Sequence, residues 1–417
     1  MPTLVNPKPK QLDDYRKVIG EEAYQEIVEL AKPLAGKRVL HLNATASGGG
    51  VAELLYTLVP LTNSVGLVAD WAVMDGAPDF YQVTKTMHDS LQGAKTVWTD
   101  EMWDTWRRYN EITAKGIDVS NYDYIVVHDP QPAGVVSYAR DTESGVRTRW
   151  FWRCHIDLTD ASQEVWETIR PFVEQYEGLV FTLEEYVKDG LRGPEVFISP
   201  PGIDPLSPKN VKLDNTARYK VLATAGIDPE RPLIAQVSRF DPWKDPLGVI
   251  DVYREAKKQV PGLQLAMVAN VASDAPDGWV FYEKTLRHAG EDPDIHFLTD
   301  PMGLGNDVEV SAIQTTADVV IQKSICEGFG LVVTEALWKA RPMVAGNAGG
   351  IRMQVIDGET GYLATSNEDY VHRVLGLLGD QETACRMGEA GREHVRKNFL
   401  ITRYLRDYLR MFNRFAR

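Results

Sequence analysis

The stretch that decides the fold runs from Ala317 to Ala345. Ala317-Asp318-Val319-Val320-Ile321-Gln322 is short, apolar and rich in β-branched residues, which predicts a buried strand. Glu327-Gly328-Phe329-Gly330 predicts a turn, Leu331 to Ala340 a helix, and Pro342-Met343-Val344-Ala345 the next strand. This order is typical of an open parallel α/β sheet, which binds ligands at the carboxyl ends of its strands.

Two carboxylates flank the helix start in this stretch. Glu327 lies on the predicted loop, and Glu335 lies eight positions later, about one turn into the helix. The glycines between them allow backbone N–H groups to approach a ligand closely. Carboxylates in this place accept hydrogen bonds from vicinal hydroxyls, so we expect a sugar, a ribose or both. The alternative is an ordinary loop beside a solvated helix face.

Composition and charge narrow the class of protein. The chain has 417 residues, of which 44% are hydrophobic and 25% charged, enough for two or three globular domains. Its formal net charge of −14 argues against binding to nucleic acid or to anionic membranes. Cys154, Cys326 and Cys385 are scattered, which excludes a disulfide framework and fits a reducing compartment. We find no signal peptide and no membrane-spanning apolar run, and therefore expect a cytoplasmic protein.

Strands and helices alternate along the chain, which predicts parallel sheets covered on both faces. The proline-rich segment 199–205 interrupts the alternation and predicts a linker. We therefore predict an α/β protein with two doubly wound, Rossmann-like domains facing a central cleft. The domains would span residues 1–200 and 206–395, and a C-terminal helix over 396–417 would pack back on the first. Strands are expected at 39–42, 65–73, 124–128, 150–156, 180–182, 196–198, 233–237, 265–269 and 295–298, besides the two strands named above.

A glycine-rich loop follows the first strong strand. The strand ends at Asn43, and Ala44-Thr45-Ala46-Ser47-Gly48-Gly49-Gly50-Val51 leads into a predicted helix. Backbone N–H groups and the helix dipole bind phosphate in such a loop. The loop is not G-x-G-x-x-G and lacks the Lys-Ser/Thr of a nucleotide-triphosphate loop. A flexible turn is the alternative.

Two cations follow the strand at 233–237. Arg239 and Lys244 lie five apart in Ser238-Arg239-Phe240-Asp241-Pro242-Trp243-Lys244. In an acidic protein they predict an anionic ligand such as a pyrophosphate, because Arg forks onto two oxygens and Lys acts as a point charge. Salt bridges to Asp241 and Asp245 are the alternative.

Histidines stand at the ends of two other predicted strands. In Trp150 to Ile156 alternate residues share a face, so Arg153 and His155 lie together, and this placement predicts a cleft floor. His128 closes the strand at 124–128 in the same way. Each histidine alone is more often structural, but two in equivalent places favour function.

These residues carry a resemblance to a known family. Arg239 with Lys244, His155, and the spacing of Glu327 and Glu335 resemble the retaining GT-B glycosyltransferases of family 4, as does Gly349-Gly350 before Asp357-Gly358-Glu359-Thr360-Gly361. Within that group, 41–45, 48–53, 127–133, 152–157 and 238–244 look like the trehalose glycosyltransferring synthases. The resemblance implies GT-B architecture and covers nearly the whole chain.

The resemblance also implies roles for single residues. Arg239 and Lys244 would hold the donor diphosphate, Glu335 the ribose, and Glu327 hydroxyls of the transferred glucose. His155 would contact that glucose near the reacting carbon, and the loop 48–50 would close over donor and acceptor. The implied catalytic residues are His155, Glu327, Arg239 and Lys244. The implied donor-binding residues are Gly49, Gly50, Arg239, Lys244, Glu327, Gly328, Phe329, Gly330, Leu331 and Glu335, and the acceptor-binding residues are Asn43, Ser47, His128, Asp129, Arg153 and Asp157.

Two positions depart from the family pattern. Many relatives have Gly directly after the Lys, where this chain has Asp245-Pro246. Many have an acid three residues after the second Gly of Gly349-Gly350, where this chain has Met353. Neither departure removes a catalytic candidate, but both leave the preferred base of the donor open.

The leading hypothesis is a retaining, reversible transfer of glucose from ADP-, UDP- or GDP-glucose to free glucose, which forms α,α-trehalose. The resemblance assigns no carboxylate nucleophile, and Asp157 is the only acid near His155, so we favour departure and attack on one face. We expect no required cofactor and no metal site, with Mg²⁺ dependence left open, and a homodimer. The alternatives are a trehalose phosphorylase using glucose 1-phosphate, a sugar-nucleotide epimerase and a non-catalytic carbohydrate-binding protein. A nicotinamide dehydrogenase would need G-x-G-x-x-G.

Overall fold

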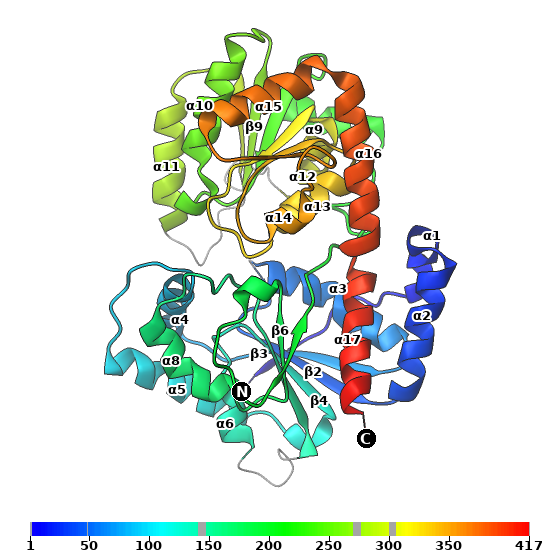
Figure 1. Ribbon diagram of the computed structural model, residues 1–417, viewed down its shortest axis with the longest axis vertical. Coiled ribbons are helices and arrows are strands. Elements are labelled where there is room, and N and C mark those ends of the chain that lie inside the picture. Colours follow the sequence, from blue (N-terminus) through cyan, green and yellow to red (C-terminus); the bar gives the residue numbers. More distant parts are fainter. Residues whose placement is uncertain (1, 48, 141–146, 270–276, 300–305, 417) are drawn as a thin grey trace. The chain divides into compact units, whose positions relative to one another are not determined.

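The chain forms two compact units, each built around its own sheet (Figure 1). The structure is a computed structural model, and it describes residues 2–47, 49–140, 147–269, 277–299 and 306–416. Unit 1 comprises residues 1–202 together with 401–417, and unit 2 comprises residues 203–400. The change of unit at residues 202 and 203 falls inside the proline-rich segment.

Unit 1 contains a seven-stranded sheet in the order β1-β3-β2-β4-β5-β6-β7. Every neighbouring pair is parallel except β1 and β3, which are antiparallel. From β2 onward the order is that of a flavodoxin-like sheet, whose direction of winding reverses between β2 and β4. The strands are β1 (Thr3–Val5), β2 (Arg38–Asn43), β3 (Val68–Val73), β4 (Tyr124–His128), β5 (Arg149–Arg153), β6 (Gly178–Phe181) and β7 (Glu195–Ile198).

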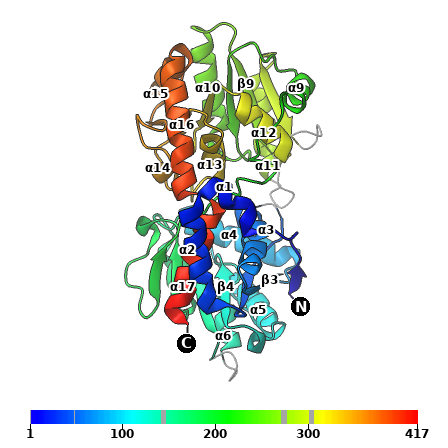
Figure 2. The ribbon, with the colours of Figure 1, turned by 90° about the vertical axis from the view of Figure 1, so that its right-hand side faces the viewer.

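Helices cover both faces of this sheet. One face packs through Trp150 and Trp152 into a core shared with α4, α5, α6 and α8. The other face packs through Tyr124 and Phe151 against Phe412 of α17, and α17 lies beside α2 (Figures 1 and 2). The helices are α1 (Arg16–Ile19), α2 (Glu21–Ala31), α3 (Gly50–Ser64), α4 (Pro78–Leu91), α5 (Asp100–Lys115), α6 (Val135–Ala139), α8 (Gln163–Val173) and α17 (Ile401–Phe415).

Unit 2 contains a six-stranded sheet, parallel throughout, in the order β10-β9-β8-β11-β12-β13. In chain order this is 3-2-1-4-5-6, the Rossmann arrangement, which reverses between β8 and β11. The strands are β8 (Leu233–Val237), β9 (Gln264–Ala269), β10 (Ile295–Thr299), β11 (Val319–Gln322), β12 (Met343–Gly346) and β13 (Tyr362–Ala364). The helices are α9 (Asn215–Thr224), α10 (Pro246–Lys257), α11 (Asp277–Ala289), α12 (Asp307–Thr316), α13 (Leu331–Trp338), α14 (Ile351–Gln354), α15 (Asn367–Gly379) and α16 (Gln381–Asn398).

The predicted strands are present, with two corrections to the predicted elements. The strand predicted over 150–156 ends at Arg153, so His155 lies beyond the sheet and is not held by its alternation. The helix predicted over 396–417 is not continuous, because α16 ends at Asn398 in unit 2 and α17 begins at Ile401 in unit 1.

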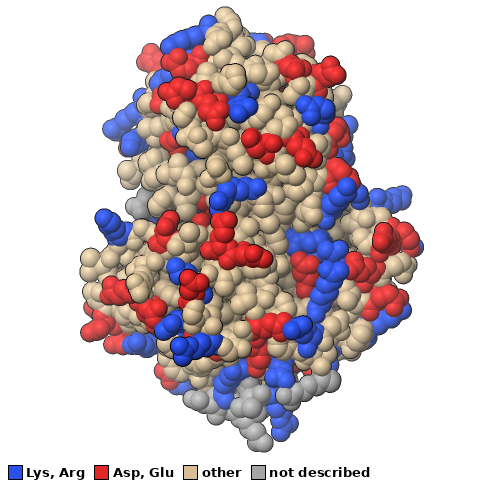
Figure 3. Space-filling view, in the orientation of Figure 1, with Lys and Arg blue, Asp and Glu red and all other residues tan. Residues whose placement is uncertain are grey.

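Surface charge and helix hydropathy agree with the composition. Acidic and basic side chains are interspersed on the visible face of each unit (Figure 3). Among the helices that the structure describes, none combines the length and the apolar character needed to span a membrane.

Candidate active site

A nearly buried pair of charged side chains in unit 2 lies at the switch point of its sheet. Lys244 follows β8 and Glu327 follows β11, and the Lys244 Nζ lies 2.6 Å from the Glu327 Oε2. Both side chains are only about one-eighth exposed, at 12% and 13%. The Ser324 hydroxyl donates to the same carboxylate oxygen at 3.3 Å. The switch point is where open α/β sheets bind ligands, so the sheet order places a cation and an acid at the expected ligand site.

The backbone of the turn after Glu327 leaves room for the Glu327 side chain. Gly330 caps α13 with a φ of +85°, a conformation that L side chains rarely adopt. A Cβ atom on Gly330 would also lie 3.1 Å from the Glu327 Cγ. The first turn of α13 then presents its backbone N–H groups toward the same end of the sheet as Glu327.

Asp245 explains one departure from the family pattern. Its φ is +42°, in the left-handed region that glycine favours and Asp tolerates. Its side chain accepts a hydrogen bond from the Gly248 N–H at 3.1 Å, which caps α10. The same carboxylate forms an ion pair with Lys323, which follows β11. Asp245 therefore adopts a conformation that glycine favours, and it adds a cap and a charge partner. The sequence analysis did not single out Lys323, although it lies one residue beyond a strand end.

Glu335 is the most buried acid of the candidate site. The residue is 1% exposed, and its Oε1 lies 3.5 Å from the Lys209 Nζ. Neither carboxylate oxygen accepts a hydrogen bond from the described residues. Buried carboxylates normally have hydrogen-bond donors, so these two oxygens are suited to receive donors from a ligand. No local sequence signal identifies Lys209, because it meets Glu335 only through the fold.

Arg239 lies on the loop after β8 and is the most exposed of the predicted donor residues with a charged side chain. Its side chain is 59% exposed and lies 3.5 Å from the Asp241 carboxylate, the contact that the sequence offered as the alternative reading. An exposed pair of this kind contributes little to stability. Release of Asp241 would therefore cost the guanidinium little free energy.

In unit 1 the two predicted histidines, His128 and His155, join His41, which the sequence analysis did not single out, in a hydrogen-bonded chain. His41 within β2 places its Nδ1 3.0 Å from the Nε2 of His128 at the end of β4. The His128 Nδ1 lies 3.0 Å from the Nε2 of His155, which follows β5. Burial lowers the pKa of His41 to about 3 and the pKa values of His128 and His155 well below 6.5, with Arg153 as a further cause for the latter two. All three rings are therefore neutral at physiological pH.

Three of the predicted acceptor residues have hydrogen-bond partners within unit 1. The guanidinium of Arg153 is fully buried and donates to the Tyr404 hydroxyl, the Val180 carbonyl and the Thr182 hydroxyl. It therefore braces α17 against the sheet and is not exposed to a substrate. His128 uses both ring nitrogens in the chain described above. The Asn43 amide donates to the Thr45 carbonyl and accepts from the Trp71 indole, which holds the loop after β2.

The remaining predicted residues of unit 1 lie on loops at the carboxyl edge of the sheet. Asp129 has a φ of +66°, and its carboxylate accepts from the His155 backbone N–H at 2.7 Å. Burial raises the pKa of this carboxyl group. Asp157 accepts from the Thr159 N–H, and Ser47 is exposed. Gly49 caps α3, which begins at Gly50, whereas Gly48 lies outside the described residues. Asp129 adopts a conformation that non-glycine residues rarely take, which is typical of functional positions.

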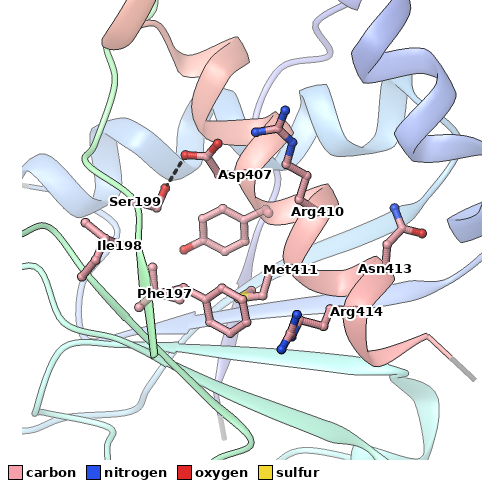
Figure 4. Close-up of a pocket in the computed structure, with 10 residues that line it drawn as sticks. Phe197, Ile198, Ser199, Asp407, Arg410, Met411, Asn413 and Arg414 are labelled. Atoms are coloured by element: carbon pink, nitrogen blue, oxygen red, sulfur yellow. Dashed lines mark hydrogen bonds between the residues drawn. The ribbon is translucent and has the colours of Figure 1, made fainter. Parts of the chain in front are cut away.

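A surface pocket of about 640 Å³ lies elsewhere in unit 1, between β7 and α17 (Figure 4). Its charged side chains are engaged within the protein. Arg410 pairs with Glu26, Arg414 pairs with Glu195, and the Ser199 hydroxyl donates to Asp407 at 2.9 Å. The pocket contains none of the predicted site residues, and we assign no ligand to it. In the part of the chain that the structure describes, no cluster of three or more His, Cys, Asp or Glu side chains is placed to hold a metal ion.

Comparison with known proteins decides the family. The family described as "Trehalose synthase, N-terminal domain" matches residues 41–188, and "Glycosyl transferases group 1" matches residues 220–394. The chain is 46% identical to the trehalose synthase of Pyrococcus horikoshii, over 97% of this chain and 96% of that protein. It is 49% identical to the trehalose synthase of Rubrobacter xylanophilus, over 98% of each. The chain belongs to the trehalose synthase family.

Solved structures show that this trehalose synthase family member has the GT-B fold. A trehalose-6-phosphate synthase, OtsA, superposes with a TM-score of 0.71 at 15% identity, covering 90% of this chain and 99% of that one. The trehalose-phosphate synthase of Burkholderia xenovorans, solved in complex with glucose-6-phosphate, gives a TM-score of 0.73 at 13% identity, covering 91% of this chain and 100% of that one. These likenesses confirm the predicted α/β class with two parallel-sheet domains. Family and fold together establish trehalose-related glycosyl transfer.

The neutral histidines predict a pH dependence of stability. Their pKa values are lower in the folded protein than in the unfolded chain, so only the unfolded chain binds these protons as the pH falls through about 6.5. Stability should therefore decline on acidification, by up to about 1.4 kcal/mol per pH unit for each histidine.

Urea denaturation between pH 7.5 and pH 5 measures this decline. In the variant His41→Phe, the slope of the free energy of unfolding against pH should be smaller by the contribution of one proton. His288→Phe, whose histidine is partly exposed on α11, serves as the control. Equal slopes in wild type and His41→Phe would show that His41 is already charged in the folded protein.

Proposed function

We propose that the protein transfers glucose from a nucleotide-glucose donor to free glucose and forms α,α-trehalose, and that the reaction is reversible. The observation that carries this proposal is the site at the switch point of unit 2. There Lys244 and Glu327 form a nearly buried ion pair, and Glu335 has two buried oxygens that accept no hydrogen bond from the described part of the chain. A cation, a neighbouring acid and a second acid with unused acceptors match a diphosphate, a sugar and a ribose. The identity to trehalose synthases over nearly the whole chain supports the product.

Each donor group has a partner in this proposal. Lys244 exchanges Glu327 for a diphosphate oxygen, and Arg239 adds a forked contact from its exposed position. Glu327, released from Lys244, accepts from hydroxyls of the transferred glucose. Glu335 accepts from the ribose hydroxyls. The cations thereby stabilise the negative charge that develops on the leaving diphosphate.

The transfer proceeds on one face of the donor sugar. The bond between the anomeric carbon and the diphosphate oxygen breaks, and the anomeric oxygen of the acceptor glucose forms the new bond on the same face. The leaving diphosphate accepts the acceptor's proton, so the protein needs no general base and the α configuration is retained. His155 is neutral and hydrogen-bonds a hydroxyl of the transferred glucose.

A donor panel tests this function. The protein is incubated with ¹³C-glucose and ADP-, UDP- or GDP-glucose in turn, and separately with glucose 1-phosphate, and the product is identified by NMR. We expect α,α-trehalose with at least one nucleotide-glucose and none with glucose 1-phosphate. Trehalose from glucose 1-phosphate alone would establish a phosphorylase instead, an activity named for fungal relatives that are 24–25% identical to this chain. An α,β- or β,β-linked product would overturn the one-face mechanism.

The role of Glu335 predicts discrimination at the ribose. Wild type should bind the preferred nucleoside diphosphate more tightly than its 2′-deoxy analogue, by roughly tenfold or more, because a hydrogen bond to a charged group contributes about 1.5–3 kcal/mol. In Glu335→Gln this ratio should fall toward one, measured by isothermal titration calorimetry. Glu389→Gln, an exposed position on α16, is the control and should keep the wild-type ratio. A wild-type affinity ratio in Glu335→Gln would show that Glu335 does not bind the ribose.

A further inference from the structure

The chain of three imidazoles in unit 1 has a property that no single histidine has. His128 stands in the middle with both ring nitrogens at hydrogen-bond distance, 3.0 Å from His41 on one side and 3.0 Å from His155 on the other. The His128 and His155 rings are stacked with centroids 5.3 Å apart. The His41 ring also packs on the Tyr408 ring of α17. His41 and His128 are buried, whereas His155 is partly exposed and forms the outer end of the chain.

The donor and acceptor rules of neutral imidazoles allow the row of three histidines only two arrangements of its ring protons. A neutral imidazole carries one N–H and one bare nitrogen, and each contact needs one of each. If the His128 Nε2 carries the proton, it donates to the bare His41 Nδ1, and the His128 Nδ1 accepts from the His155 Nε2. If the His128 Nδ1 carries the proton, it donates to the bare His155 Nε2, and the His41 Nδ1 donates to the His128 Nε2. An unbroken neutral chain therefore requires the same tautomer in all three rings.

The tautomer at the outer end follows from the inner end. In the first state the His155 Nδ1 is a bare acceptor, and in the second it is an N–H donor. His41 forms the buried inner end on β2, against the Tyr408 ring of α17, so a change there acts on all three rings. We propose that His41 and His128 are positioning residues that fix the ring orientation and the tautomer of His155. This proposal rests on the proposed function for the role of His155 toward the sugar, but the chain itself can be tested without any substrate.

Neighbouring groups hold the outer ring in place for this purpose. The His155 backbone N–H donates to the Asp129 carboxylate, and the Asp129 N–H donates to the Arg153 carbonyl. Arg153 is in turn held by Tyr404 of α17, whose hydroxyl lies 3.1 Å from the Tyr408 hydroxyl. The loop that carries His155 is therefore fixed through its backbone, while the hydrogen bond that the described residues give the ring comes from His128. Replacement of His41 or His128 should free the His155 ring and leave the loop that carries His155 in place.

The first test reads the tautomers directly in the substrate-free protein. Histidine is labelled with ¹⁵N, and long-range proton–nitrogen correlations distinguish bare from protonated ring nitrogens. Signals are assigned by their loss in His41→Phe and His155→Phe. We expect one tautomer shared by His41, His128 and His155 in wild type, and a mixture of tautomers at His155 in His41→Phe. Different tautomers at His41 and His155 in wild type, or an unchanged His155 in His41→Phe, would overturn the proposal.

The second test reads the effect on transfer. His41→Phe should lower kcat about three- to tenfold with little change in KM, which corresponds to the loss of one ordinary hydrogen bond. His41→Asn, whose side-chain amide can replace the Nδ1 contact to His128, should recover to within about twofold of wild type. His296→Phe on β10 of unit 2 controls for the general cost of replacing a partly buried histidine.

The two tests separate the possible failures. Equal kcat losses in His41→Phe and His41→Asn, with unchanged thermal unfolding, would overturn the positioning role. If the donor panel fails but the three rings share a tautomer that His41→Phe disturbs, the proposed function fails and the histidine chain stands. Shared tautomers with no kcat loss in His41→Phe would contradict the positioning role while leaving the donor panel intact.

Discussion

The ion pair between Lys244 and Glu327 is the interaction on which the account of unit 2 depends. Lys244 and Glu327 are 83 positions apart in the sequence, and they lie on the segments that follow β8 and β11, which are adjacent in the sheet. Two nearly buried charges stabilise a fold only when they are paired and hydrogen-bonded, so the pair fixes the loops after both strands. In the proposed function Lys244 exchanges Glu327 for a diphosphate oxygen and Glu327 accepts from glucose hydroxyls, so the structural contact and the proposed binding site are one arrangement.

Unit 1 meets the same constraint with neutral hydrogen-bond partners. Arg153 is fully buried among hydroxyl and carbonyl acceptors, and the three histidines satisfy one another. Hydrogen bonds make such burial tolerable, because an unpaired polar group would cost free energy. The consequence is a division of roles at this edge of the sheet. His155 and Asp129 remain partly exposed, whereas His41, His128 and Arg153 support them from within.

Much of the fold could be predicted from the sequence, because local patterns determine the helices and strands. The strands at 124–128 and 233–237 have the predicted bounds, since each is a short, mainly apolar run that a polar residue follows directly. The positions of Glu327, Lys244 and His155 on the segments after strands follow from that order. The burial of Arg153 could not be predicted, because its partner Tyr404 lies 251 residues away. Lys209 and Lys323 were missed for the same reason, since their contacts with Glu335 and Asp245 arise only in the folded unit.

The most direct test of the central claim is calorimetric titration of a nucleoside diphosphate into wild type, Lys244→Ala and Glu327→Gln. If Lys244 exchanges Glu327 for the diphosphate, Lys244→Ala should weaken binding by roughly ten- to a hundredfold. Glu327→Gln should bind at least as tightly as wild type, because its lysine no longer has a competing partner. Lys258→Ala, an exposed lysine paired with Glu255, is the matched control and should bind as wild type does. Unchanged affinity in Lys244→Ala, or a large loss in Glu327→Gln, would contradict the account.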